Sequence, residues 1–344
     1  MLLTAVACWA ASDDAAGWSA KSAASYLDQR AEWWAGWQRS ARDHGTFCVS
    51  CHTALPYALA RPALRGALGE SGPSAPERKL LENIATRVRQ WSEVKPFYSD
   101  PTGAKQVESR TTEAVLNALI LSSYDPRTAD ARAALQNMWE LQVKTGEQQG
   151  SFTWLNFHNA PWEYEESPYW GATLAALAAS SQPAESRPSG QVKLLAEYLR
   201  RDVHSTTLLN RVFLLYAASR LPGLIDRQTS GSIVAEIRGL QREDGGWNLA
   251  SLTGGWKRKD ETALETASDG YATGLIALAL ERSGVPRKDP ALARGLAWLA
   301  GHQNRSEGFW PSWSLNKKRD PESDVGRFMP DAATAYAVLA LTSH

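Results

Sequence analysis

The residues best suited to chemistry form one short run: Cys48, Val49, Ser50, Cys51 and His52. This C-x-x-C-H order is the attachment pattern for c-type haem. Two thiols three positions apart can each bond one vinyl group of a single haem, and the imidazole beside the second thiol can then bind the iron. The sequence therefore predicts one covalently attached haem c, anchored by Cys48 and Cys51, with His52 as the iron ligand.

Two other chemistries use closely spaced cysteines. A structural zinc site needs a second Cys/His pair, and none follows at the required spacing. A thioredoxin-like C-x-x-C site needs a βαβ context, whereas both flanks of this motif have helical patterns. The stretch from Thr46 to Tyr57 resembles the haem-binding segment of c-type cytochromes, and this resemblance covers only these few residues.

A second axial ligand to the iron would come from a histidine or a methionine. The chain offers His44, His158, His204, His302, Met138 and Met329. Met329 directly precedes an apolar helical pattern, and His158 lies in an aromatic loop. We keep these two as the candidate distal ligands.

The composition bounds the class of protein. The chain has 344 residues, 43% of them hydrophobic, enough for one large or two ordinary domains. Its net charge of zero argues against a nucleic-acid partner, which would favour a basic surface. No apolar run is long enough to span a membrane. The 15 tryptophans suggest aromatic structural motifs, an apolar cavity, or both.

The N-terminus resembles the end of a secretory signal, with an A-x-A-like site at residues 5–7. It lacks the basic region and a full apolar region. Cys8 follows this site and is a candidate for lipidation, although Ala5 stands where bacterial lipoproteins usually have Leu. The cytochrome resemblance implies that haem is attached outside the cytoplasm. We therefore expect a periplasmic or exported protein, with membrane association only through lipidation at Cys8.

Hydrophobic periodicity predicts an all-α protein, because no segment shows the period-two pattern of a strand. Helices that are apolar all round alternate with amphipathic ones, which predicts an inner and an outer layer. We expect a signal remnant and linker at 1–20, N-terminal helices with the haem segment at 21–107, and a repeating part at 108–344. The predicted helices span residues 23–42, 52–68, 77–94, 108–124, 127–143, 168–181, 191–202, 206–220, 231–241, 268–283, 290–303 and 330–342.

A glutamine followed by a Gly-x-aromatic turn recurs after the amphipathic helices. The three copies are Gln142 with 150–152, Gln241 with Gly245-Gly246-Trp247, and Gln303 with Gly308-Phe309-Trp310. From Glu108 to the C-terminus the chain resembles the squalene–hopene cyclases and related triterpene cyclases, whose QW repeats have this order. The resemblance implies an α/α toroid of about six helix pairs. It also implies that each Gln caps an outer helix while the Trp packs in a short loop before the next helix.

The catalytic residues of these relatives do not carry over. The cyclases protonate a double bond with a D-x-D-D motif, which is absent here. The related protein prenyltransferases use Asp, Cys and His to bind zinc, and no Cys of this chain remains for that role. Acids at the starts of apolar helices, Glu113, Asp269 and Asp331, could instead gather for proton transfer, with helix capping as the competing interpretation. A carboxylate pair for glycoside cleavage among Glu163, Glu165 and Glu166 is a further alternative, which competes with a plain surface loop.

These features predict an exported c-type haem protein on a triterpene-cyclase-like toroid. Its role would be electron transfer, or oxidation of an apolar ligand in a central pocket whose rim carries Asp269 and Asp331. The partners expected are a redox protein and an apolar small molecule. The alternatives are a cyclase-like isoprenoid or lipid enzyme with a structural haem, and a non-catalytic binding scaffold. The redox role is compatible with a haem-dependent oxidoreductase, the first alternative would be a cyclase-like enzyme without D-x-D-D, and the scaffold would not be an enzyme.

Overall fold

The computed structural model describes residues 17–343, and over that range the protein is all-α, which confirms the predicted fold class. The only strand-like pairings there are three isolated bridges. The expected signal remnant and Cys8 lie outside the described residues. The twelve α-helices of this part of the chain are α1 Ala20–Gly36, α2 Ala54–Leu68, α3 Ala75–Arg89, α4 Ala104–Tyr124, α5 Ala129–Glu140, α6 Ser167–Ser180, α7 Ser189–Arg201, α8 Leu208–Arg220, α9 Arg227–Gly239, α10 Gly270–Arg282, α11 Pro290–Gly301 and α12 Phe328–Thr342.

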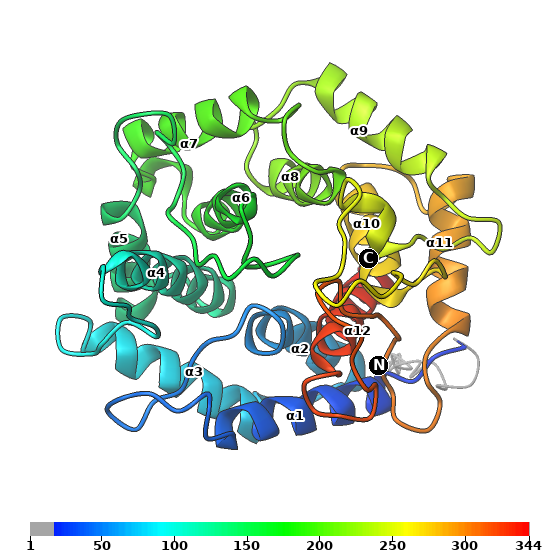
Figure 1. The fold of residues 1–344 in the computed structure, drawn as a ribbon, viewed down its shortest axis with the longest axis horizontal. Coiled ribbons are helices and arrows are strands. Elements are labelled where there is room, and N and C mark those ends of the chain that lie inside the picture. The colour runs from blue at the N-terminus through cyan, green and yellow to red at the C-terminus, as the bar shows by residue number, and fades with distance from the viewer. Residues whose placement is uncertain (1–16, 344) are drawn as a thin grey trace, which may run out of the picture.

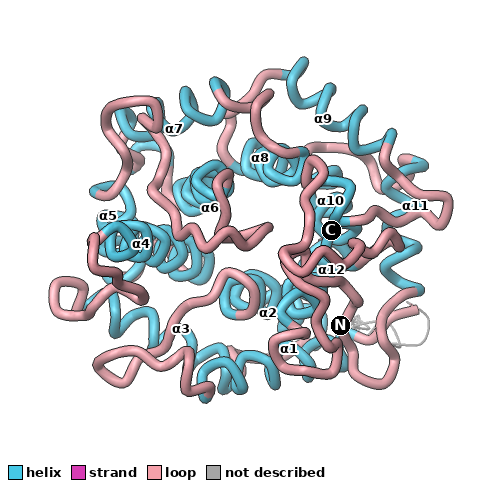
Figure 2. The backbone as a smooth tube through the Cα atoms, viewed as in Figure 1, coloured by secondary structure: helices cyan, strands magenta, loops and turns pink. Residues whose placement is uncertain are grey.

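The helices form two concentric rings (Figure 1). The even-numbered helices make the inner ring and are seen end-on, while the odd-numbered helices lie around them and are seen from the side. Each inner helix packs on the next, and α12 packs on α2, so the inner ring closes. Figure 2 shows that long loops cross one face of this ring.

Residue composition explains which helix lies in which ring. The inner helix α10 buries every residue from Gly270 to Leu280, whereas the outer helix α9 buries only Ile233 and Ile237. A helix that is apolar all round must be covered on all sides. Small residues allow close packing between neighbours in the inner ring: a Cβ at Gly274 would lie 2.5 Å from the backbone nitrogen of Ala337.

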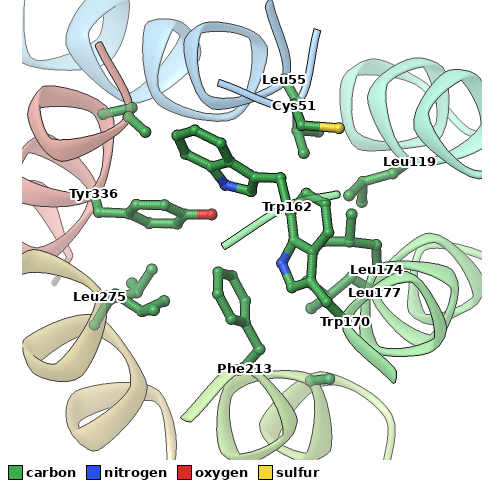
Figure 3. Close-up of a cluster of buried hydrophobic side chains, with 14 of the residues drawn as sticks. Cys51, Leu55, Leu119, Trp162, Trp170, Leu174, Leu177, Phe213, Leu275 and Tyr336 are labelled. Atoms are coloured by element: carbon green, nitrogen blue, oxygen red, sulfur yellow. The ribbon is translucent and has the colours of Figure 1, made fainter. Parts of the chain in front are cut away.

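Aromatic side chains meet in the middle of the inner ring (Figure 3). Trp162, Trp170, Phe213 and Tyr336 point inward from different elements. The ring centroid of Tyr336 lies 5.9 Å from that of Phe213 and 5.2 Å from that of Tyr271, which in turn lies 6.0 Å from Trp162. All five side chains are buried. They occupy the place where the sequence predicted an open apolar pocket.

Three glutamine side chains join consecutive outer helices. The Nε2 atom of each glutamine donates two hydrogen bonds. One goes to a carbonyl oxygen in the turn after its own helix, and the other goes to a carbonyl oxygen at the start of the neighbouring outer helix. The acceptors are Gly150 and Gln191 for Gln142, Gly245 and Ala291 for Gln241, and Gly308 and Ser19 for Gln303. These bonds link α5 to α7, α9 to α11, and α11 to α1.

The bridge at Gln303 closes the outer ring. Its Nε2 donates to the carbonyl oxygen of Ser19 at 3.0 Å, and its Oε1 accepts from the Ser19 backbone N–H at 2.6 Å. Ser19 is also the N-cap residue of α1, since its hydroxyl accepts from the backbone N–H of Ser22. The last outer helix is therefore fastened to the first across 284 positions of sequence.

The tryptophans that follow two of these glutamines are fully buried. The indole N–H of Trp247 donates to the carbonyl oxygen of Ile237 at 2.8 Å, and that of Trp310 to Leu299 at 2.7 Å. Each ring therefore fastens a long loop to the end of the preceding outer helix. The prediction that these loops are short was wrong: they run over residues 240–269 and 302–327, because both cross the face of the ring before entering an inner helix.

Candidate haem site

The C-x-x-C-H segment lies between α1 and the start of the inner helix α2. Ser50 caps that helix, because its hydroxyl oxygen accepts the backbone N–H of Ala54 at 3.0 Å. Cys48 is fixed by its backbone N–H, which donates to the carbonyl oxygen of Ser40 at 2.8 Å. Both thiols are free and buried, 6% and 4% exposed. The sulfur of Cys51 points into the ring toward α4 (Figure 3).

A hydrogen-bond relay determines which nitrogen of His52 carries the proton. Nδ1 of His52 lies 2.9 Å from the hydroxyl of Thr53, and that hydroxyl donates to Oδ2 of Asp331 at 2.6 Å. A hydroxyl has one proton, so Thr53 must accept from His52, which places hydrogen on Nδ1 and the lone pair on Nε2. Burial has the largest effect on the pKa of His52, and the positive charges of Arg30 and Arg319 have smaller effects in the same direction. Together they lower this pKa to about 3. The imidazole is therefore neutral at pH 7, as a metal-binding histidine must be.

Asp331 anchors this relay. Its Oδ1 accepts from the hydroxyl of Tyr26 and from Nε of Arg30, each at 2.8 Å, and Arg30 also binds Asp324. Burial raises the pKa of Asp331, while Arg30 and its other donors lower it. The side chain is 1% exposed and fully engaged. The prediction that Asp331 lies on the rim of an open pocket is therefore wrong.

Asp269, the second predicted rim residue, caps α10. Its carboxylate accepts from the backbone N–H groups of Ala272 at 3.0 Å and Leu249 at 2.6 Å, and from the hydroxyl of Ser312 at 3.1 Å. It is 1% exposed, and burial raises its pKa to about 6. Glu113 was also predicted at a helix start, which is wrong: α4 begins at Ala104, so Glu113 lies in the middle of that helix, where it is buried in an ion pair with Arg87. These contacts favour the capping and pairing interpretation over an acid cluster.

Aromatic rings enclose the imidazole of His52. Phe328, the first residue of α12, stacks on it with centroids 3.7 Å apart, and Trp34 of α1 meets it edge-on at 4.9 Å. Trp162 lies 5.9 Å away. Trp34 also donates from its indole nitrogen to the carbonyl oxygen of Cys48 at 2.6 Å. In the sequence, the only feature that indicated this aromatic enclosure was the cluster of three tryptophans within residues 33–37.

The two candidate distal ligands have different surroundings. Met329 is buried at 3% exposure in α12. The side chain of His158 is 72% exposed and pairs with Glu165. Neither residue is among the aromatic or hydrogen-bond partners of His52 within residues 17–343. The residue that α12 brings onto His52 is Phe328 rather than its neighbour Met329.

Three loops interlace across the face of the ring that carries the motif. Asn316 exchanges two hydrogen bonds with the backbone of Ala160, at 3.0 and 2.6 Å, and its carbonyl oxygen accepts from the backbone N–H of Lys259 at 3.0 Å. These bonds join the loops before α6, α10 and α12. They hold the hairpin of residues 157–163 over the ring, with Trp162 reaching inward.

The three acids considered for glycoside cleavage lie in different surroundings. Glu166 accepts the backbone N–H of Thr207 at the start of α8, and Glu165 is on the surface. Glu163 is half-buried, and its charge acts on both thiols of the motif. From its sequence context Glu163 was a candidate only as a sugar-site acid, and no local pattern predicted its electrostatic effect on the two thiols.

Burial dominates the ionisation of this region. It raises the pKa of Cys48 to about 12 and that of Cys51 well above its ordinary value, and the charge of Glu163 adds to both shifts. Burial also raises the pKa of Glu163 to about 7, against the charge of Lys105. Both thiols are therefore protonated near neutral pH.

The donor set fits haem c. The chain presents two free thiols at the required spacing and an imidazole whose Nε2 lone pair is available. Because the thiols are buried and His52 packs on Phe328 and Trp162, a haem could bind here only if these two aromatic side chains rearranged.

Comparison with known proteins finds no family model that matches this chain and no curated protein with significant similarity to it. Between residues 17 and 343, no group of three or more His, Cys, Asp and Glu side chains is arranged to hold a metal ion. Over the same residues, none of the helices has the length and apolar character needed to cross a bilayer.

Proposed function

We propose that this protein is a c-type haem protein that transfers electrons, with the helical ring as its scaffold. The observation that carries the proposal is the relay from His52 through Thr53 to Asp331, beside two free thiols at haem spacing. The aromatic side chains in the ring centre favour electron transfer over oxidation of a ligand held there. Export, and a redox protein as partner, belong to the same proposal.

In this function each residue of the site has a defined part. Cys48 and Cys51 would hold the haem as two thioethers: each S–H would add across one vinyl group, with sulfur bonding one carbon and the hydrogen going to its neighbour, so that nothing is oxidised. Nε2 of His52 would be the iron ligand, while Thr53 and Asp331 hold the imidazole in its orientation. The bound haem supplies a one-electron couple.

We also propose a relationship of fold to the triterpene cyclases. The support is the recurrence of one contact, in which Gln142, Gln241 and Gln303 each join consecutive outer helices. The proposal concerns architecture alone, because the acidic motif of those enzymes is absent. A determined structure of the haem-loaded protein in which these glutamine bridges are missing would contradict it.

The test is expression with export and a cytochrome maturation system. We expect a pyridine haemochrome spectrum of haem c, and haem that stays with the protein in acid acetone. Replacing Cys48 and Cys51 together with Ala should abolish covalent attachment, and His52→Ala should change the visible spectrum because the iron loses its proximal nitrogen.

The matched control is Val49→Ala, which changes a buried position between the two cysteines and leaves all three donors in place. This variant should keep its covalent haem. A wild-type protein that stays colourless, or that loses its haem to acid acetone, overturns the proposed function.

A further inference from the structure

A cleft lies between the loop before α6 and the loop before α10, on the face of the ring that the long loops cross (Figure 2). Its volume is about 450 Å³. Glu165 and Glu166 line it from the first loop, the turn of residues 254–257 lines it from the second, and Thr207 at the start of α8 completes the wall. This volume is in the usual range for a small-molecule site.

Contacts within the protein fix the walls of this cleft. The indole N–H of Trp256 donates to the carbonyl oxygen of Leu315 at 3.1 Å, and the ring of Tyr164 meets the indole edge-on with centroids 5.4 Å apart. Oε2 of Glu166 accepts the backbone N–H of Thr207 at 2.8 Å. A site whose side chains are already held in place loses less conformational freedom when a ligand binds.

The same cleft presents hydrogen-bonding groups that the protein leaves available. The hydrogen bonds that the Glu166 side chain accepts all go to Oε2, so Oε1 has no donor within residues 17–343. Glu165 and Lys257 are exposed, and Lys257 makes no ion pair in that part of the chain. A carboxylate only accepts hydrogen bonds, whereas an ammonium only donates them. A ligand in the cleft must therefore both donate and accept.

Charge and shape argue against several classes of ligand. An anion would meet two carboxylates, and a metal ion would meet the ammonium of Lys257. A quaternary ammonium is bound by a cage of exposed rings, but here Tyr164 is only 4% exposed and Trp256 alone is half-buried. A purely apolar ligand would cover charged groups without giving them partners, which is costly.

A neutral ligand with many hydroxyl groups meets all of these conditions. Each hydroxyl can donate to a carboxylate oxygen of Glu165 or Glu166 and can accept from Lys257. The C–H face of a sugar ring is apolar and can pack on the exposed part of the Trp256 indole, which combines an apolar body with a polar edge.

A second hollow, of about 200 Å³, adjoins the cleft, because Tyr164 and Glu165 line both. Its other polar side chains are mainly amides and hydroxyls, and they are Gln148, Asn156, Ser151, Thr153 and Glu108. Such uncharged donors and acceptors suit hydroxyl groups. Two adjoining hollows fit a chain of linked rings better than a single ring.

We propose that this cleft binds a neutral oligosaccharide, with one sugar ring packed on Trp256 and its hydroxyl groups hydrogen-bonded to Glu165, Glu166 and Lys257. The saccharide binds and leaves unchanged, and no bond is broken. This inference goes beyond the proposed function and does not depend on haem, so the failure of either one leaves the other intact.

The main experiment is saturation-transfer difference NMR, followed by isothermal titration calorimetry. The probes are cellotriose, maltotriose and the trimer of N-acetylglucosamine, and at least one should bind saturably. Glu165→Gln and Lys257→Met each remove one charged partner at an exposed position, and each should weaken binding by about tenfold or more. The matched controls are Glu185→Gln, before α7, and Lys288→Met, before α11. Both positions are exposed and outside the cleft, and both variants should bind as the wild type does.

Trp256 tests the packing of the sugar ring. Trp256→Ala should abolish binding, whereas Trp256→Phe keeps an aromatic face and should retain part of it, with circular dichroism showing that both variants are folded. Failure of all three neutral probes to bind overturns the inference. Binding that survives Glu165→Gln and Lys257→Met unchanged also overturns it, because the saccharide then lies elsewhere. Tighter binding of trigalacturonate or choline than of the neutral probes would show that the class of ligand is wrong.

Discussion

Replacing Gln303 with Ala should weaken the closure of the outer ring. The side chain is 9% exposed and makes three hydrogen bonds, two with the backbone of Ser19 and one with the carbonyl oxygen of Gly308. Alanine leaves three backbone groups without their partners. At a net value of about 1 kcal/mol for each bond, the free energy of unfolding should fall by about 2 to 4 kcal/mol. For a chain of this length, that corresponds to a melting temperature lower by about 3 to 6 °C.

The assay is urea denaturation followed by tryptophan fluorescence, because Trp18 and Trp310 lie 5.8 Å apart beside this junction. Gln228→Ala is the matched control: it makes the same change at an exposed position on α9, and such a substitution stays within about 0.5 kcal/mol. Hydrogen exchange adds a local readout. The amide of Ala23, which bonds to Ser19 in the first turn of α1, should lose protection in Gln303→Ala only. A Gln303→Ala protein as stable as the control would refute the reasoning.

Three further substitutions test packing, ionisation and pairing. Trp310→Ala should lower the free energy of unfolding by about 3 to 5 kcal/mol in chemical denaturation, since the ring is fully buried. For Asp269, burial raises the pKa from 3.8 to about 6, so its ionisation costs the wild type stability as pH rises through this interval. Asp269→Asn lacks that cost, and its deficit in melting temperature should therefore be larger at pH 4 than at pH 7. Asp331→Ala should cost about 3 kcal/mol in urea, because Arg30 stays buried without its main partner. Combining Arg30→Met with Asp331→Leu should recover part of that loss.

Each of these expectations has an outcome that contradicts it. A Trp310→Ala protein within 1 kcal/mol of the wild type in the free energy of unfolding would mean that the loop packs elsewhere. A deficit of Asp269→Asn that does not change between pH 4 and pH 7 would show that this carboxyl ionises normally. If the double variant Arg30→Met with Asp331→Leu is no more stable than Asp331→Ala, the unpaired charge of Arg30 does not cause the loss of stability.

Local patterns in the sequence predicted much of the helix ring. The alternation of apolar and amphipathic segments located all twelve helices of residues 17–343, and the segment predicted at 108–124 is α4, Ala104–Tyr124. The segment predicted at 23–42 ends early, at Gly36, because the chain turns there and Ser40 pairs with Cys48. Helix type follows from neighbouring residues, whereas a helix end can depend on contacts with another segment.

The candidate site likewise has one part that local sequence predicts and another that depends on contacts between distant segments. The cysteines and His52 form a local motif and were identified from five residues. The partners of His52 are distant in sequence: Phe328 and Asp331 reach it only because the inner ring closes between α12 and α2. Glu163 had no local signal, since its position depends on a hairpin fastened to the neighbouring loops by Asn316 and Lys259.

The long sequence separation between His52 and α12, the helix that covers it, affects the order in which the site is assembled. Thr53 and Asp331 are 278 positions apart. Helix α12 is the last helix of residues 17–343, and it brings Phe328 onto His52. Under the proposed function, an attachment enzyme would have to reach Cys48 and Cys51 on the exported chain before α12 packs on α2. Packing of the C-terminal helix would then be the folding step that ends access to the two thiols.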